Sequence, residues 1–147
     1  MNIITSLCLS LCFIFLGINR VINIKRNTLS LYEAISFINM VKNNIRFSSM
    51  NYENLIECGK KEKFSFINFD DDVKLSKYVN EKVRLEFSGF VNKIGTTDSA
   101  GQLALCDEYI ERFKAFYNES ACNEKGKVNI VVSISVLSVV CVLILGG

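Results

Sequence analysis

The residue types that could perform chemistry are few, and the densest group is one acidic run. Asp70-Asp71-Asp72 places three carboxylates together, which raises the question of a cation site. An EF-hand loop would need oxygen ligands at alternating positions, a central glycine and a closing glutamate, and these are absent. Because the sequence contains no histidine, an ordinary zinc or iron site has few ligands left. We therefore predict no metal site, and we expect Asp72 to cap a helix.

The composition also argues against catalysis. Without histidine, neither a Ser-His-Asp nor a Cys-His arrangement can be assembled. Gly95 and Gly101 are not followed by the lysine of a phosphate-binding loop. A formal net charge of +2 over 147 residues gives no nucleic-acid footprint. The sequence thus predicts a non-enzymatic protein with no catalytic residues, no cofactor, no nucleic-acid partner and no small-molecule substrate.

The six cysteines fall into two groups. Three lie in apolar runs at the chain ends and three in the region between them: Cys8, Cys12 and Cys141, then Cys58, Cys106 and Cys122. The central three have neither metal nor redox spacing. In a reducing compartment we expect them to be buried small apolar residues. An alternative stays open, because an inverted topology with an outward-facing domain would permit Cys58 to pair with Cys106 or Cys122.

Both ends of the chain are apolar enough to enter a membrane. Residues 3–18 carry no charge, and basic residues follow this run instead of preceding it, which differs from a cleavable signal peptide. We predict an uncleaved membrane helix over residues 1–24. Residues 128–147 also carry no charge, and as a helix they would span about 30 Å, the thickness of the hydrocarbon layer. A second membrane helix is therefore predicted over residues 126–147.

Basic residues flank only the region between these two runs. The membrane-flanking set is Arg20, Lys25, Arg26, Lys125 and Lys127. The outer ends of both runs carry no lysine or arginine. The positive-inside rule then places the central region, residues 25–125, in the cytoplasm and makes membrane lipids a partner.

Helical spacing dominates the central region. The absence of proline and the presence of only eight glycines favour long helices over a turn-rich β fold. Thr28 or Ser30 is expected to cap a first helix, and Asn51 a short second helix that Gly59 ends. Apolar residues continue the helical spacing through Leu31, Ile35, Ile38, Val41 or Met40, and Ile45; Leu55 and Ile56; Val73, Leu75, Tyr78, Val79, Val83, Phe87, Phe90, Val91 and Ile94; and Leu103, Cys106, Tyr109 or Ile110, Phe113, and Phe116 or Tyr117.

One aromatic segment departs from this spacing. Phe64, Phe66, Ile67 and Phe69 nearly alternate with polar residues, which would suit a strand, but the sequence offers no partner strand. We expect loop aromatics that fill the core of a bundle. The predicted fold class is therefore all-α, a small helical bundle inserted between an N-terminal and a C-terminal transmembrane helix.

The stretch from Gly95 to Gln102 is expected to end one helix and begin another. Gly95 suits the left-handed residue that closes a helix. Thr97 and Ser99 can each accept from the free N–H groups of a new first turn, and Ser99 with Gln102 matches a capping box. Asp98 complements the positive end of the helix dipole. On spacing alone, two ordinary caps meet at a corner here.

The order of these features resembles the stage III sporulation protein AB family of endospore-forming bacteria. The similarity runs over most of the chain, from the first membrane helix and its basic edge to the last membrane segment. Its most specific part is Gly95-Thr96-Thr97-Asp98 with Gln102 four residues on. The chain departs from the family at Ile94, where leucine is usual, at Met50, near which a proline is usual, and at residues 128–131, where the family carries glycines.

The resemblance implies a place in the transenvelope assembly between mother cell and forespore. The family's soluble domain is a helical bundle similar to the cytoplasmic domain of the type II secretion inner-membrane platform protein. Implied partners are the other stage III sporulation channel proteins and a cytoplasmic secretion-type ATPase. The implied location is the mother-cell membrane facing the forespore. The implied docking residues are Gly95, Thr96, Thr97, Asp98 and Gln102, where the resemblance is sharpest.

Two other functions remain open from the sequence. One is a membrane-tethered cytoplasmic adaptor of a secretion system unrelated to sporulation, with the same bundle and a different partner. The other is an outward-facing domain stapled by disulfides. Topology distinguishes the second from the cytoplasmic reading, and the identity of the partner distinguishes the first.

Overall fold

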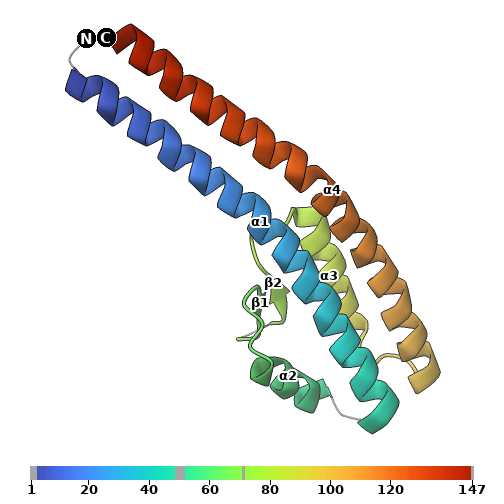
Figure 1. Ribbon diagram of the computed structural model, residues 1–147. Helices are drawn as coiled ribbons and strands as arrows, with labels where there is room; N and C mark the ends of the chain where they lie inside the picture. The colour runs from blue at the N-terminus through green and yellow to red at the C-terminus, as the bar shows by residue number, and fades with distance from the viewer. Residues whose placement is uncertain (1–2, 49–51, 71, 147) are drawn as a thin grey trace. The chain divides into compact units, whose positions relative to one another are not determined.

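The computed structural model describes residues 3–48, 52–70 and 72–146. The described chain is 82% helix and consists of four helices and two short strands. In chain order these are α1 (Ile3–Ser48), α2 (Tyr52–Lys61), β1 (Ile67–Asn68), β2 (Lys74–Leu75), α3 (Glu81–Lys93) and α4 (Ser99–Gly146) (Figure 1). The protein is therefore mostly helical, as an all-α fold class requires.

The chain divides into two compact units, and both long helices contribute to each. The core unit is Asn27–Ser120, and it contains the second part of α1, all of α2, β1, β2 and α3, and the first part of α4. The two-helix unit combines Met1–Arg26 with Ala121–Gly147.

Aromatic rings fill the centre of the core unit. Phe37 of α1 is 1% exposed, and Phe87 of α3 and Phe113 of α4 are fully buried. The ring of Phe87 lies between the other two, with centroid distances of 5.7 Å to Phe37 and 6.1 Å to Phe113. Aromatic pairs at these separations add to the energy of burial itself. The three helices are thus joined through one chain of rings, and Figure 1 shows α3 beside both long helices in this unit.

The apolar face predicted for the helix before the corner is confirmed. Val83, Phe87, Phe90 and Val91 of α3 are all buried. Ile94, the residue that follows the helix, packs against the same core while partly exposed. A helical period read from sequence therefore located the buried face of α3, because residues three and four apart share one side of a helix.

No helix begins at Thr28 or Ser30, so that capping prediction is wrong. Helix α1 runs without a break from Ile3 to Ser48, and both residues are buried in its interior. The Thr28 hydroxyl lies 3.1 Å from the Ser120 hydroxyl of α4, and the Ser30 hydroxyl lies 3.1 Å from that of Ser76. Backbone N–H groups inside a helix already have partners, so these hydroxyls bond to other elements instead of capping.

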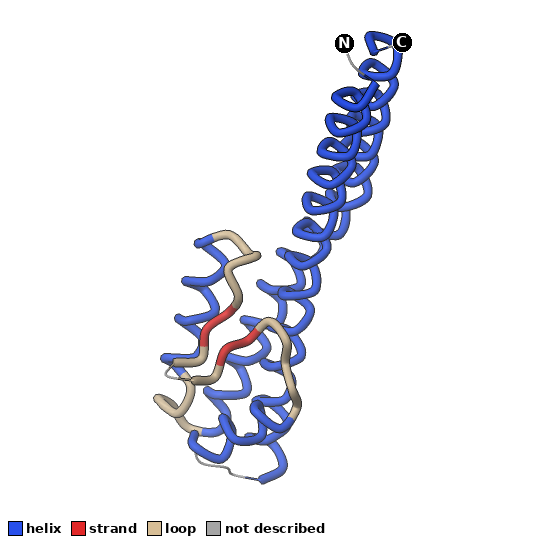
Figure 2. The backbone as a smooth tube through the Cα atoms, turned by 90° about the vertical axis from the view of Figure 1, so that its left-hand side faces the viewer, coloured by secondary structure: helices blue, strands red, loops and turns tan. Residues whose placement is uncertain are grey.

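The aromatic segment does contain a strand, and its partner is nearby. Ile67 pairs with Leu75, and Asn68 pairs with Lys74, in an antiparallel pair of two-residue strands (Figure 2). Ile67 and Leu75 face the core, while the other two side chains are exposed. The expectation that residues 64–69 form only a loop is therefore wrong, although the flanking Phe64 and Phe69 do pack against the core.

The chain before α3 is not helical, so Asp72 is not a helix cap. Asp72 is exposed and pairs with Lys74 of β2 at 2.9 Å. The cap is Asn80, whose side-chain oxygen accepts from the Val83 N–H at 2.8 Å. Val73 and Leu75 are buried, but as part of the strand segment rather than the predicted helix. A strand residue and a helix residue can both supply a buried apolar position, which explains the wrong period.

Helix α2 does not end at Gly59. It continues to Lys61, and Gly59 is buried within it. A Cβ at Gly59 would lie 2.7 Å from a ring carbon of Phe69. This glycine therefore allows an aromatic ring to approach the helix. The prediction that Gly59 ends the helix missed this role. Asn51, the predicted cap of this helix, lies outside the described residues.

The two-helix unit brings the apolar parts of α1 and α4 side by side. A Cβ at Gly17 would overlap the Ser135 side chain, so the two backbones approach closely at this pair. Ser135 donates its hydroxyl proton to the Val131 carbonyl of its own helix at 2.8 Å, which satisfies it without a third partner. Small residues permit such close approach between helices in lipid.

Among the described residues, one helix is long and apolar enough to cross a membrane. It is α4, over Ser99–Val142. Its most apolar stretch of 18 residues has a mean hydropathy of 1.7, and none of that stretch is buried. The sequence-based expectation of a C-terminal apolar helix is consistent with this. The N-terminal membrane helix stays a prediction, because most side chains of the first ten residues lie outside the described ones.

Candidate docking corner

The corner between α3 and α4, residues 95–102, is set by one left-handed glycine. Gly95 has φ +82°, as its sequence position predicted. The turn is closed by Thr96, whose backbone N–H and hydroxyl both donate to the Lys93 carbonyl, at 3.3 Å and 2.8 Å. The Lys93 carbonyl at the end of α3 is thereby satisfied within the corner itself.

Asp98 caps α4, which corrects the predicted cap by one position. Its Oδ1 accepts from the Gly101 N–H at 2.9 Å, and its carbonyl accepts from the Gln102 N–H at 2.8 Å. Since α4 begins at Ser99, neither Thr97 nor a Ser99–Gln102 capping box fills the role. Aspartate is among the best capping residues, and its charge also suits the helix dipole.

Gln102 supports the corner from beneath. It is 5% exposed, and its Nε2 lies within donor distance of three acceptors: the Lys93 carbonyl at 3.4 Å, the Thr97 carbonyl at 3.4 Å and the Thr97 hydroxyl at 3.3 Å. These contacts tie the end of α3 to the start of α4. Its Oε1 is buried without a hydrogen-bond partner among the described residues, so Gln102 carries a desolvation cost at this position.

Gly101 is a corner residue that sequence reasoning missed. A Cβ there would lie 2.9 Å from both the Thr97 hydroxyl and the Asp98 Oδ1. The absence of a side chain lets the two polar groups fold over the first turn of α4. The available signal was a glycine inside the first turn of a helix, where propensity disfavours it by about 1 kcal/mol.

The structure brings the five candidate residues together and divides them into two roles. Gly95, Thr96, Thr97 and Asp98 are exposed, whereas Gln102 is buried. The outer four form a small polar surface that ends in one carboxylate. The buried glutamine links this surface to the end of α3 through its contacts with Thr97 and the Lys93 carbonyl. The corner can therefore present hydrogen-bonding groups in a fixed arrangement.

The five membrane-flanking basic residues all belong to the two-helix unit. Arg20, Lys25, Lys125 and Lys127 are exposed, and Arg26 is half-buried. They lie on the two helical segments that pair in this unit. They make no part of the corner, whose residues all belong to the core unit.

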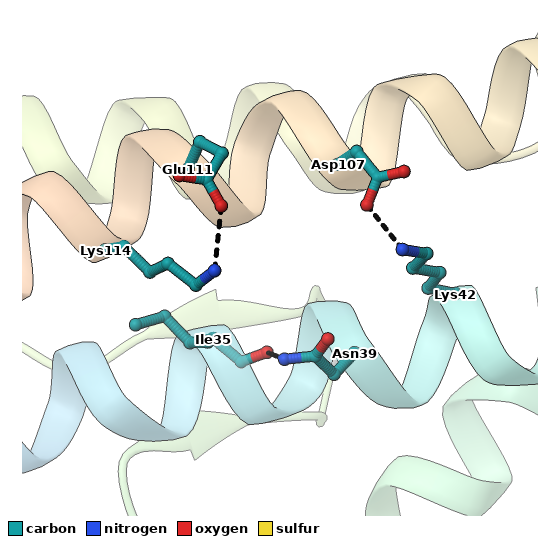
Figure 3. A network of polar contacts seen from close by, with 6 residues as sticks. All are labelled: Ile35, Asn39, Lys42, Asp107, Glu111 and Lys114. Carbon is teal, nitrogen blue, oxygen red and sulfur yellow. Dashed lines mark hydrogen bonds and ion pairs between the residues drawn. The ribbon is translucent and has the colours of Figure 1, made fainter.

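Exposed ion pairs lie on the surface of the core unit, within α4 and between α4 and the helices α1 and α3. Figure 3 shows Lys42 of α1 paired with Asp107 of α4, and Glu111 paired with Lys114 on α4 itself. Arg112 contacts Glu108 at 2.6 Å and Glu86 of α3 at 3.2 Å, and mainly the Glu108 charge raises the pKa of the Arg112 guanidinium. Such exposed pairs contribute about 0–1 kcal/mol each, so they add little to the stability of the core unit.

The central cysteines differ in exposure, which corrects the expectation that all three are buried. Cys106 is fully buried, Cys58 is half-buried and Cys122 is exposed. Burial, together with the nearby Asp107 charge, raises the pKa of the Cys106 thiol to about 11. Within the described residues these cysteines are unpaired, and no group of three metal-ligating side chains gathers.

Alanine substitution should show that Asp98, and not its neighbour Thr97, caps α4. Asp98→Ala is expected to lower the free energy of unfolding by about 1 kcal/mol, since the Gly101 N–H loses its acceptor. Thr97→Ala should cost less, because Gln102 keeps two carbonyl acceptors at the same distance range. Urea unfolding of the purified full-length protein in detergent measures both. Equal losses for the two variants would contradict Asp98 as the cap.

Comparison with known proteins identifies no relative: no family model matches the chain, and no curated protein or solved structure is significantly similar to it.

Proposed function

We propose that this protein is a non-enzymatic membrane component of the mother cell–forespore transenvelope assembly, and that it docks partner proteins through the corner. The observation that carries the proposal is the arrangement at residues 95–102. The residues that carry the family resemblance form one exposed polar surface, Gly95 to Asp98, fixed from beneath by buried Gln102. The Gln102 amide lies within donor distance of acceptors on Lys93 and Thr97, so these contacts hold the surface in one arrangement that a partner protein can recognise.

Membrane attachment is the second element of the proposal. The helix α4 is long and apolar enough to span a bilayer, and the N-terminal segment of α1 pairs with its apolar end. The two segments would cross the mother-cell membrane together. In the sequence, basic residues flank each apolar run only on the side that leads into the core unit. By the positive-inside rule the core unit would therefore face the cytoplasm. There it could meet a secretion-type ATPase.

A site-specific crosslink tests the proposed docking. A photo-crosslinking amino acid placed at Thr96, an exposed corner residue, should capture another stage III channel protein or the secretion-type ATPase in sporulating cells. The same group at exposed Lys82 of α3 serves as the matched control. Capture of a component of an unrelated secretion system would favour the adaptor alternative. Equal capture at both positions would contradict a docking role for the corner.

Topology gives an independent prediction through the cysteines. If the core unit faces the cytoplasm, an impermeant thiol reagent added to intact cells should leave exposed Cys122 unmodified, and permeabilisation should expose it. Cys106 should react slowly even after permeabilisation, because its side chain is fully buried and burial raises the pKa of its thiol to about 11. Labelling of Cys122 in intact cells at the rate of an external control would overturn the proposed orientation.

A further inference from the structure

The two-helix unit contains an apolar groove between its helices. The groove has a volume of about 490 Å³ and is lined on one side by Ile14, Ile18 and Ile22 of α1, and on the other by Val132, Val136 and Val140 of α4. Gly17 and Ser135, which approach each other closely, also line the groove. Ile14, Ile18 and Ile22 remain 43%, 54% and 39% exposed, so this face of the helix pair is open.

One end of the groove carries lysines. Lys25 follows Ile18 by seven residues and Ile14 by eleven, so it continues the groove face of α1. Lys125 precedes Val132 by seven and Val136 by eleven, which places it on the groove face of α4. Counting from the Gly17–Ser135 contact, both lysines lie toward the same end of the antiparallel pair. Both lysines are exposed. Glu124 is the only acidic residue in the sequence of residues 121–147.

The length of the groove fits one leaflet of a bilayer. From Ile14 to Ile22 the helix rises by about 12 Å. Half of a hydrocarbon core is about 15 Å. Lys25 lies about 5 Å beyond Ile22 at the same rise per residue. An acyl chain in the groove would therefore place its phosphate at the level that the lysine ammonium groups reach.

We propose that this groove is a binding site for an anionic phospholipid, with an acyl chain between α1 and α4 and the headgroup phosphate at Lys25 and Lys125. This inference rests on the membrane attachment proposed above. The occupant is a lipid because the lining is apolar, the length is that of a single leaflet, and the charge at one end is complementary to a phosphate. The cytoplasmic leaflet, which the proposed topology places at this end, is also where anionic lipids attract basic residues.

The sequence offers a clean optical test, because the chain has no tryptophan. Ile18→Trp places the only indole in the groove. Leu16→Trp places it two residues away, at a position 63% exposed and absent from the groove lining. Each variant of the full-length protein is reconstituted in vesicles of phosphatidylcholine and phosphatidylglycerol, with bromine on the acyl chains of one lipid at a time. Brominated chains quench a tryptophan that they contact.

At position 18, phosphatidylglycerol is expected to be preferred over phosphatidylcholine by about tenfold or more, since each lysine near a phosphate contributes about fivefold. At position 16 the two lipids should quench in proportion to their abundance. In the Ile18→Trp background, Lys25→Gln should lower the preference about fivefold. Arg20→Gln removes the same charge from a different face of α1 and should lower it less than twofold.

Several outcomes would overturn the site. Equal quenching by both lipids at position 18 would mean a groove filled by bulk lipid, and a preference unchanged by Lys25→Gln would remove the headgroup contact. If position 16 is quenched and position 18 is not, protein fills the groove, as a helix from a second copy would. If neither position is quenched by either lipid, the chain does not enter the bilayer, and the proposed membrane attachment fails together with the lipid site.

Discussion

Phe37→Ala is expected to lower the free energy of unfolding of the core unit by about 3–5 kcal/mol. Phe37 is 1% exposed, and the rings of Phe64, Phe69 and Phe87 surround it at centroid distances of 6.0, 5.7 and 5.7 Å. The substitution would remove a ring that contacts both the strand segment and α3. Rigid neighbouring rings collapse poorly into the resulting cavity, so the cost should lie in the upper part of the range.

Helix α1 provides a matched control for this substitution. Phe47 is 79% exposed, and Phe47→Ala should change stability by no more than about 0.5 kcal/mol. Urea unfolding of the purified full-length protein, followed by circular dichroism, measures both variants. Similar losses for Phe37→Ala and Phe47→Ala would show that the ring cluster does not organise the core unit.

Gly95→Val is expected to cost about 1–2 kcal/mol or more, because a β-branched side chain is poorly tolerated at positive φ. The φ of Gly95 is +82°, while nothing lies within 4 Å of the position that a Cβ would take. The penalty is therefore one of backbone conformation and involves no collision. Gly95→Asn should cost less than Gly95→Val, since asparagine visits the left-handed region more readily.

A glycine in α3 supplies the contrasting case. Gly89 has helical neighbours on both sides, and an added Cβ would only touch the Tyr109 hydroxyl at 3.5 Å, an ordinary contact. Gly89→Ala should therefore stabilise the protein by about 0.5–1 kcal/mol. The two glycines lie six residues apart, and opposite signs in the same unfolding assay would separate helix propensity from the left-handed turn. A neutral Gly95→Val would contradict the corner geometry.

Helix faces and the left-handed turn were predictable because each follows from local chemistry. The spacing of Val83, Phe87 and Phe90 defines one side of α3 whatever it packs against. The position of Gly95 after that spacing indicates a left-handed closure, since other residues pay for positive φ. These features need no information from distant parts of the chain.

The remaining features depend on contacts that local sequence does not encode. Thr28 reads equally well as a cap or as a buried hydroxyl, and only Ser120 of α4 decides between them. The strand pair consists of two residues on each side and depends on burial of Ile67 and Leu75 against the helices. At the corner, residues 97–99 are all good capping residues, so the sequence left the first residue of α4 uncertain by one position. The hydrogen bond from the Gly101 N–H to Asp98 identifies Asp98 as the cap.

The central claim is that the corner docks a partner, and Asp98→Asn tests it most directly. Asparagine caps helices about as well as aspartate, so the bond from the Gly101 N–H to a side-chain oxygen is retained. The lost charge lowers the dipole contribution by less than about 1 kcal/mol. If the Asp98 carboxylate pairs with a cation of the partner, Asp98→Asn would weaken the binding free energy by about 2 kcal/mol or more, which is over tenfold in affinity.

The measurement is spore yield in a strain whose only copy carries Asp98→Asn, with protein level and melting temperature determined in parallel. Glu119→Gln, which neutralises another exposed carboxylate of α4, is the control and should sporulate normally. We predict that Asp98→Asn lowers spore yield severalfold while the protein accumulates and melts as the wild type does. Normal spore yield at normal protein level would contradict docking and leave Asp98 as a helix cap alone.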